Sequence, residues 1–551
     1  MVQKKHEMRK FVFLMLLYSS LFQAQEHAWV YFKDKPSAES YLNAPISMLT
    51  QRALDRRSLQ NIEVNIQDVP VEHSYVTAVR SSQGIVLKAR SRWLNAVHVM
   101  GNQAAIEQLI DLASVDRIQF ANKNSASPRS PILSSSKIIK SSKFASLQNL
   151  EYGEAENQVK MIGIDSFHTA GYEGLGKQIA IIDAGFYGVD TAGAFSHLFD
   201  GEVSNGEILG GYDFVTSSGQ YYQDTGTSHG THVLSTIAAI KEDEFVGTAP
   251  KSSFYLFITE EVSNESPLEE SLWVQAAERA DSLGVDILNT SLGYSEFDDA
   301  RYNYTYADMD GKTTFITRGA NIAAQKGIVV VNSIGNSGND AWQYLTAPSD
   351  AKNIVAVGAV NIDRSMTSFS SYGPSSDQRV KPETLAQGGD VKIVDSDNIV
   401  KTSNGTSFSG PIIAGAVACL WEFYPEKSSL EIRDLIIQNS NLFMNPTQQG
   451  GYGLLNLTHL ITELPVSREI KLSPFSISFL NDIKTLRFQF NEPIVEALDV
   501  QVFSVAGVIL KRKFVTEFDC DIKFTDVAQG LYYLRYSYKN KNELMTFYKM
   551  N

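Results

Sequence analysis

Three short segments of this chain of 551 residues carry side chains that together could form a nucleophilic site. Asp183 ends an apolar run, His229 begins the sequence His-Gly-Thr-His, and Ser407 follows Gly-Thr. A serine hydroxyl becomes a nucleophile when an imidazole takes its proton, and a carboxylate holds that imidazole in the required tautomer. These segments, in the order Asp, His, Ser, therefore predict a Ser-His-Asp triad.

Asp183 and His229 lie at the ends of predicted elements. A strand over 178–183 ends at the aspartate, and a helix over 231–240 begins just after the histidine. At such edges an α/β sheet exposes side chains to substrate. His232, one helical turn further, is expected to be a hydrogen-bonded core residue. The two histidines could instead hold a metal, but no cluster of further Cys or His ligands accompanies them.

Ser407 precedes a run of small residues that predicts a helix over 409–420. Free N–H groups and the helix dipole at such a terminus favour negative charge beside the nucleophile. Pro411 is expected in the first turn, where a missing N–H costs no hydrogen bond. Small side chains along this helix allow it to run through a tightly packed core.

Composition and charge exclude several classes of function. The 48 Lys and Arg against 62 Asp and Glu give a net charge of −14, which argues against nucleic acid or an anionic membrane as the main partner. The chain has only two cysteines, Cys419 and Cys520, so no disulfide framework is present and a structural zinc site is disfavoured. The length predicts several domains.

The N-terminus has the pattern of a signal peptide over residues 1–24. Basic residues precede an apolar run over 11–17, which is too short to cross a bilayer, and small and polar residues follow. We therefore expect a protein that is secreted or located at the cell surface.

Residues 26–121 predict a first folded unit. Its elements alternate in the order β-α-β-β-α-β, which is the ferredoxin-like arrangement. The predicted strands are 28–32, 84–90, 93–99 and 115–120, and the predicted helices are 45–60 and 103–113. Residues 122–149 are rich in Ser and predict an exposed linker.

The remaining chain divides into two further units. Over 150–462, short apolar strands alternate with helices, which predicts a parallel sheet with helices on both faces. Those strands are 177–183, 253–258, 285–291, 327–332 and 353–360, and helices over 268–283 and 315–326 lie between some of them. Residues 468–551 contain strand-like runs without helices, which predicts a β-sandwich.

The three catalytic segments resemble those of the subtilisin-like serine proteases (subtilases, peptidase type S8), and the resemblance covers 150–462. It implies a Ser-His-Asp endopeptidase that cleaves proteins or peptides through an acyl-enzyme. The segment 329–338 resembles the one that supplies an oxyanion-hole asparagine, here Asn336. The implied substrate-binding residues are Ser291, Leu292, Gly293, Tyr294 and Gly335.

This chain departs from the usual subtilase pattern in places. Ala184 stands where Ser or Thr usually follows the aspartate, which removes one hydrogen bond near the triad. Tyr294 replaces a glycine and is expected to narrow or cap the first specificity pocket, while Ser337 suggests a neutral pocket for uncharged P1 residues. No cofactor is implied as a requirement. Calcium stays open at Asp308–Gly311, where alternate oxygen ligands and a glycine occur without a bidentate glutamate.

The flanking units fit the same resemblance. The first resembles the inhibitory propeptide of such proteases, which assists folding and then blocks the cleft. The last resembles the C-terminal sorting domain of the bacterial type IX secretion route, which implies secretion machinery as a partner; an ordinary β-sandwich binding domain is the alternative. For the whole chain, the alternatives are a non-catalytic surface protein and a peptide ligase on the same scaffold.

Overall fold

The computed structural model describes residues 25–123, 150–462 and most of the C-terminal strand region. In that last region the described residues are 470–472, 475–480, 485–490, 497–504, 509–516, 519–523, 530–538 and 541–549. The expected signal peptide and nearly all of the Ser-rich linker lie outside these residues. In the described part of the chain, no helix combines the length and apolar composition needed to cross a membrane.

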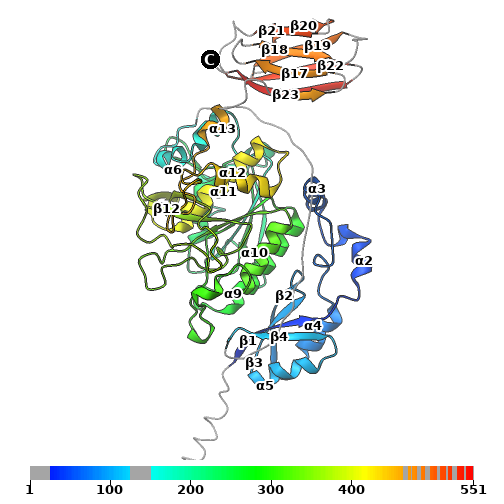
Figure 1. The fold of residues 1–551 in the computed structure, drawn as a ribbon, viewed down its shortest axis with the longest axis vertical. Coiled ribbons are helices and arrows are strands. Elements are labelled where there is room, and N and C mark those ends of the chain that lie inside the picture. The colour runs from blue at the N-terminus through cyan, green and yellow to red at the C-terminus, as the bar shows by residue number, and fades with distance from the viewer. Residues whose placement is uncertain are drawn as a thin grey trace, which may run out of the picture.

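The N-terminal unit is a four-stranded antiparallel sheet in the order β2-β3-β1-β4, as the ferredoxin-like prediction requires (Figure 1). Its core combines alternate strand residues with apolar residues of α4 and α5. The elements are β1 (Glu26–Phe32), α2 (Ala38–Leu42), α3 (Gln51–Leu59), α4 (His73–Arg80), β2 (Ile85–Ser91), β3 (Ala96–Gly101), α5 (Gln103–Glu107) and β4 (Val115–Phe120).

The helix predicted over 45–60 is wrong in its extent and in its role. A short 3₁₀ turn, Pro45–Ser47, precedes α3, and α3 directs Arg56 and Arg57 away from its own sheet. The helix that packs on the sheet is α4, through Val76 and Val79. Sequence analysis missed α4 because eight residues with two buried apolar positions give a weak helical pattern.

The central unit contains the predicted parallel sheet, with seven strands in the order β13-β12-β11-β10-β5-β9-β6. All six neighbouring pairs run parallel. The strands are β5 (Gln178–Asp183), β6 (Ile208–Asp213), β9 (Ser253–Ile258), β10 (Ile287–Thr290), β11 (Val329–Ser333), β12 (Val355–Val360) and β13 (Thr384–Gln387). The prediction lacked β6 and β13, which lie at the two edges of the sheet.

Helices cover both faces of this sheet, so each strand buries successive side chains on opposite sides. Ile181 packs with α8 (His229–Ala238) and α11 (Thr406–Phe423) on one face. Ile182 packs with α9 (Pro267–Leu283) and α10 (Phe315–Gln325) on the other. Strands buried on both sides explain the nearly continuous apolar runs in the sequence.

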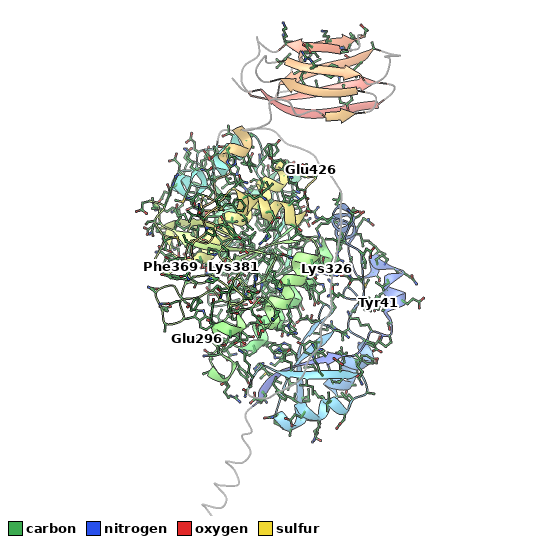
Figure 2. All side chains as sticks on the ribbon, viewed as in Figure 1. Tyr41, Glu296, Lys326, Phe369, Lys381 and Glu426 are labelled. Carbon is green, nitrogen blue, oxygen red and sulfur yellow. The ribbon has the colours of Figure 1, made fainter. Side chains whose placement is uncertain are left out.

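The N-terminal unit docks on α9 and α10. Trp29 stacks on Phe315 with ring centroids 4.8 Å apart and donates a hydrogen bond of 2.8 Å to Ser271 Oγ. Arg57 reaches Asp281 of α9 at 2.6 Å. Lys326 follows α10 (Figure 2). Its Nζ lies 3.0 Å from Asp68 Oδ1 of the N-terminal unit. The interface therefore combines aromatic packing with a buried network of charges.

The elements that the structure describes in the C-terminal region are all strands, as predicted. Two four-stranded antiparallel sheets have the orders β16-β17-β18-β21 and β20-β19-β22-β23. The strands are β16 (Ile470–Leu472), β17 (Phe475–Leu480), β18 (Thr485–Phe490), β19 (Leu498–Ser504), β20 (Ile509–Val515), β21 (Asp519–Lys523), β22 (Gly530–Tyr538) and β23 (Lys541–Lys549). The last strand was absent from the prediction.

Candidate active site

Asp183 and His229 form a hydrogen-bonded pair where β5 ends and α8 begins. His229 Nδ1 lies 2.7 Å from Asp183 Oδ1. The aspartate side chain is fully buried, whereas 30% of the histidine side chain is exposed. The imidazole therefore has one nitrogen fixed by a carboxylate and an edge that remains open to a reacting partner. This is the arrangement that a general base requires.

The electrostatic surroundings favour a protonated His229. Burial opposes the imidazolium, but the negative charge of Asp183 and its hydrogen bond outweigh burial, and the pKa of His229 is raised above 6.5. Glu260, in its ionised form, acts in the same direction. Sequence analysis missed Glu260, which follows β9 by two residues and has no motif around it.

The two carboxylate oxygens of Asp183 differ in their hydrogen bonds. Oδ1 accepts hydrogen bonds from His229 Nδ1 and from the backbone N–H of Ala184 at 2.8 Å. Oδ2 is buried and accepts none from the described residues. Residue 184 is alanine, so it has no side-chain hydroxyl that could donate to Asp183 Oδ2. This agrees with the loss of one hydrogen bond near the triad that the sequence predicted.

Ser407 lies in the first turn of α11, as predicted, and α11 packs against α8. Its hydroxyl donates to the main-chain oxygen of Ser291 at 3.4 Å. Within the described residues, no hydrogen bond joins this hydroxyl to His229. The neighbouring Phe408 ring lies 6.0 Å from the imidazole, centroid to centroid, which places the start of α11 beside the histidine. Rotation about a single side-chain bond suffices to change the partner of a serine hydroxyl.

Pro411 does not lie in the first turn, contrary to the sequence prediction. The helix begins at Thr406, three residues earlier than expected, so the proline falls inside it. A proline has no N–H to bond to the carbonyl four residues back, which here belongs to Ser407. Ser291 Oγ donates to that carbonyl instead, at 2.8 Å.

Asn336 is fixed by its side-chain oxygen. Oδ1 accepts hydrogen bonds from Thr406 N at 2.8 Å and from Thr406 Oγ1 at 2.9 Å. The amide nitrogen, Nδ2, donates no hydrogen bond to any residue that the structure describes. Asn336 is therefore oriented by the residue next to Ser407, and its amide N–H groups are free to stabilise an anion.

The predicted substrate-binding residues follow β10 and β11, the two strands next to Ser407. Leu292 and Gly335 are partly exposed, and Gly293 is exposed. Gly335 has a backbone φ of +113°, which favours glycine. A Cβ at Gly293 would collide with the Thr346 hydroxyl, and one at Gly335 would lie 3.2 Å from it. Thr346 therefore fills the space behind both segments.

The expectation that Tyr294 narrows or caps the pocket is wrong. Only 1% of this residue is exposed, because its side chain turns into the core. Its hydroxyl donates to both carboxylate oxygens of Glu260, at 2.8 and 2.7 Å, and its ring stacks on Phe297. Tyr294 instead links the segment after β10 to the glutamate whose charge acts on His229.

The residues at 308–311 do not fit a calcium ion. Lys123 Nζ lies 2.6 Å from Asp308 Oδ2, which also accepts hydrogen bonds from Thr305. Asp310 accepts hydrogen bonds from the backbone and hydroxyl of Thr313. The carboxylates thus cap local turns and neutralise a lysine, so no convergent set of free oxygen ligands remains for the ion.

Three glutamates gather beside Tyr294. Carboxylate oxygens of Glu260, Glu265 and Glu269 lie within 4.8 Å of one another. Burial is the main cause that raises the pKa of Glu260 and Glu265 to about 7 and that of Glu269 to about 9. Glu269 also accepts backbone hydrogen bonds from Glu261 and Ser266, both of 2.9 Å. Near neutral pH the cluster therefore retains protons that isolated glutamates would lose.

Comparison with known proteins identifies the family of this chain. Residues 174–456 match the Subtilase family, and residues 27–137 match the Peptidase S8 propeptide domain of Bacteroidota. Subtilisin DY of Bacillus licheniformis is 30% identical over 312 residues, which are 56% of this chain and 98% of that protein.

Two other subtilisins give the same result. Subtilisin NAT of Bacillus subtilis subsp. natto is 29% identical over 313 residues, 56% of this chain and 71% of the relative. Subtilisin Savinase of Lederbergia lenta is 29% identical over 290 residues, 52% of this chain and 92% of the relative. This chain belongs to the subtilase family, and it is a serine endopeptidase with a peptidase S8 propeptide domain.

Proposed function

We propose that Ser407, His229 and Asp183 hydrolyse peptide bonds through an acyl-enzyme. The observation that carries this proposal is the 2.7 Å pairing of His229 Nδ1 with the buried Asp183, beside the helix that begins at Thr406. A carboxylate on one imidazole nitrogen leaves the other nitrogen to take a proton from a hydroxyl. Such an arrangement serves acyl transfer rather than a purely structural role.

In the proposed reaction, the Ser407 hydroxyl turns from the Ser291 carbonyl towards His229. The imidazole takes its proton as the oxygen attacks the substrate carbonyl, and Asp183 stabilises the imidazolium. The Asn336 Nδ2 and the backbone N–H of Ser407 hold the resulting oxyanion. His229 then donates the proton to the leaving amine, and a water molecule attacks the acyl-enzyme by the same route in reverse.

Substrate binding is assigned to the segments after β10 and β11. We infer that Ser291, Leu292 and Gly293 accommodate the substrate backbone, because they follow directly on the strand that contacts Ser407. Gly335 follows β11 and directly precedes Asn336, the proposed oxyanion ligand. The side chain of Tyr294 is buried, so any contribution to binding is made by its backbone. A neutral first pocket and uncharged P1 residues are part of the same proposal.

The flanking segments suggest a secreted precursor. Residues 26–121 form the inhibitory propeptide in this proposal, supported by their contacts with α9 and α10. Residues 1–24 are the signal peptide, 122–149 the linker that is cleaved on maturation, and 150–462 the peptidase domain. The strand region at 468–551 acts as a type IX sorting domain that is recognised by the secretion machinery, and the product is secreted or held at the cell surface.

Product analysis distinguishes the proposed hydrolysis of peptide bonds from the alternative, peptide ligation. The full chain is incubated with a peptide substrate, with and without an added amine nucleophile, and the products are identified by mass spectrometry. Free carboxylic acids as the main product in both reactions support hydrolysis. Amide products that dominate when the amine is added would assign the protein to the ligases. The Ser407→Ala variant gives the background of both reactions.

A further inference from the structure

His232 is bound to a carboxylate far along the chain, although it lies one turn after His229 on α8. Its Nε2 lies 2.8 Å from Asp395 Oδ1. The side chains are 22% and 17% exposed, so the pair is half-buried at the surface rather than in the core. The prediction that His232 forms a hydrogen bond is therefore correct, and the prediction that it lies in the core is wrong.

Asp395 also binds the residue on the other side of the catalytic histidine. Ser228 Oγ donates to Asp395 Oδ1 at 3.2 Å and lies 3.1 Å from His232 Nε2. Ser228 is the N-cap of α8, but its side chain makes no capping hydrogen bond with the helix. The carboxylate of Asp395 thus binds Ser228, just before His229, and His232, one turn after it. These two contacts hold the first turn of the helix.

The carboxylate lies in a hairpin that leads to the nucleophile. Asp395 follows β14 (Val391–Val394), which pairs with β15 (Val400–Ser403), and the chain then reaches Ser407 after three residues. Val394 N donates to Ser235 Oγ of α8 at 2.9 Å, which gives the hairpin a second bond to that helix. The hairpin therefore connects the helix of the base with the helix of the nucleophile.

Asp395 remains negatively charged in this setting. Burial opposes ionisation, but hydrogen bonds from Lys401 and His232 hold the pKa of this carboxyl well below its usual range. The backbone N–H of Ser396 also donates to it, at 2.6 Å. Bonds to a charged acceptor are stronger and shorter than those between neutral groups. The contact is therefore suited to holding two chain segments at a fixed separation.

Two other roles for this group do not fit its geometry. A second catalytic triad would need the aspartate and the serine on different ring nitrogens, whereas both lie on Nε2 of His232. A metal ion would compete with the ammonium of Lys401, which is bonded to the same carboxylate. The contacts of Asp395 fit instead a role in positioning the first turn of α8.

We propose that Asp395 is a positioning residue for catalysis, which acts through Ser228 and His232 to hold His229 at the distance from Ser407 that proton transfer requires. This inference rests on the proposed function of Ser407 and His229. Displacement of a catalytic group by about 1 Å costs as much as 10²-fold in rate, whereas substrate binding depends on other residues. The contact should therefore affect kcat and leave KM unchanged.

The test compares Asp395→Asn with Asp397→Asn in the full chain, with all variants expressed and activated identically. Asp397 is the matched control, because it lies in the same turn and also binds Lys401, at 2.9 Å, but no hydrogen bond or ion pair joins its side chain to α8 in the described residues. We expect Asp395→Asn to lower kcat about tenfold or more, with KM within twofold of wild type, and to slow labelling of Ser407 by a fluorophosphonate equally. Asp397→Asn should match wild type.

A second pair of variants addresses the same contact from α8. His232→Ala should lower kcat as Asp395→Asn does, and His232→Gln, whose amide can donate to Asp395, should restore part of it. If Asp395→Asn does not fold, the difference in kcat between His232→Ala and His232→Gln tests the inference instead. Wild-type kcat in folded Asp395→Asn, or equal kcat in the two His232 variants, overturns the inference. Failure of wild-type protein to label at Ser407 would instead overturn the proposed function itself.

Discussion

The hydroxyl of Ser291 donates a 2.8 Å hydrogen bond to the main-chain carbonyl of Ser407. That carbonyl is available because the residue four positions later is Pro411, which has no N–H. The Ser407 hydroxyl in turn donates to the carbonyl of Ser291 at 3.4 Å. The end of β10 and the first turn of α11 are thus joined by two reciprocal contacts, and the proline inside the helix creates the need for one of them.

Replacement of Ser291 by alanine should weaken catalysis through this contact. The carbonyl of Ser407 then loses the hydrogen bond from the Ser291 hydroxyl, and the first turn of α11 is held less firmly. A hydrogen bond between neutral groups contributes about 1 kcal/mol, so we expect kcat/KM to fall about five- to tenfold. Steady-state kinetics on a peptide substrate measure this. The control is Ser365→Ala, which removes a side-chain hydrogen bond to Asp363 at the surface and should leave kcat/KM unchanged. An equal decrease of kcat/KM in both variants would refute the role of Ser291.

Asn336→Ala should lower kcat with little change in KM. The amide N–H groups are free in the described structure, so their proposed partner is the oxyanion that forms only during the reaction. Loss of one such donor costs about 10²–10³ in kcat, a magnitude known from subtilisin itself. Asn339→Ala, three residues later and exposed, is the control. A raised KM at unchanged kcat would mean that Asn336 only shapes the pocket.

Activity should be lost on acidification with a midpoint above pH 6.5. Only neutral His229 can accept the serine proton, and Asp183 raises the pKa of the imidazole against the opposing effect of burial. In Asp183→Asn the charge is gone while burial remains, so the residual activity should persist to lower pH. The measurement is the acid limb of kcat/KM against pH. A limb that does not move in Asp183→Asn would contradict the electrostatic role of the carboxylate.

Acid should loosen the N-terminal unit from α9. His27 and His98 lie 2.9 Å apart, and His98 Nδ1 lies 2.7 Å from Ser271 Oγ of that helix. Burial lowers the pKa of His27 to about 4, and nearby Lys88 and Arg301 add to the effect while Asp299 opposes it. Burial likewise holds the pKa of His98 well below 6.5. Burial in the docked unit thus favours the neutral form of both rings, so the stability that they contribute is present above pH 6.5 and falls as the pH drops towards 4.

Hydrogen exchange on the full-length Ser407→Ala chain measures this loosening. Protection in β1 and β3, corrected for intrinsic exchange rates, should decrease between pH 6.5 and 4. In a His27→Phe/His98→Asn double variant, protection should no longer depend on pH in this range. The same decrease in the double variant would assign the effect to other groups. Tyr302 contacts the His27 ring, the charge of Arg301 acts on it, and both bind Glu26, the residue before His27.

Local sequence predicted the parts of the site that depend on short segments. Ser253–Ile258 was predicted with its observed bounds, and the helices that carry His229 and Ser407 were found because runs of small and apolar residues are local signals. The edge strand β6 was missed because two glycines interrupt its apolar pattern. Tyr294 and Asp395 could not be understood from sequence, since the bonds that define them reach residues 34 and 163 positions away.

Labelling with a fluorophosphonate tests the central claim most directly. This probe reacts with a serine only where a base activates it, so intact-mass and peptide analysis report both the reaction and its position. We predict a single adduct on the peptide that contains Ser407 in the wild-type protein, none in Ser407→Ala, and a strongly slowed reaction in His229→Ala. Undiminished labelling of Ser407→Ala, or a wild-type protein that cleaves peptides while Ser407 stays unmodified, would contradict the account.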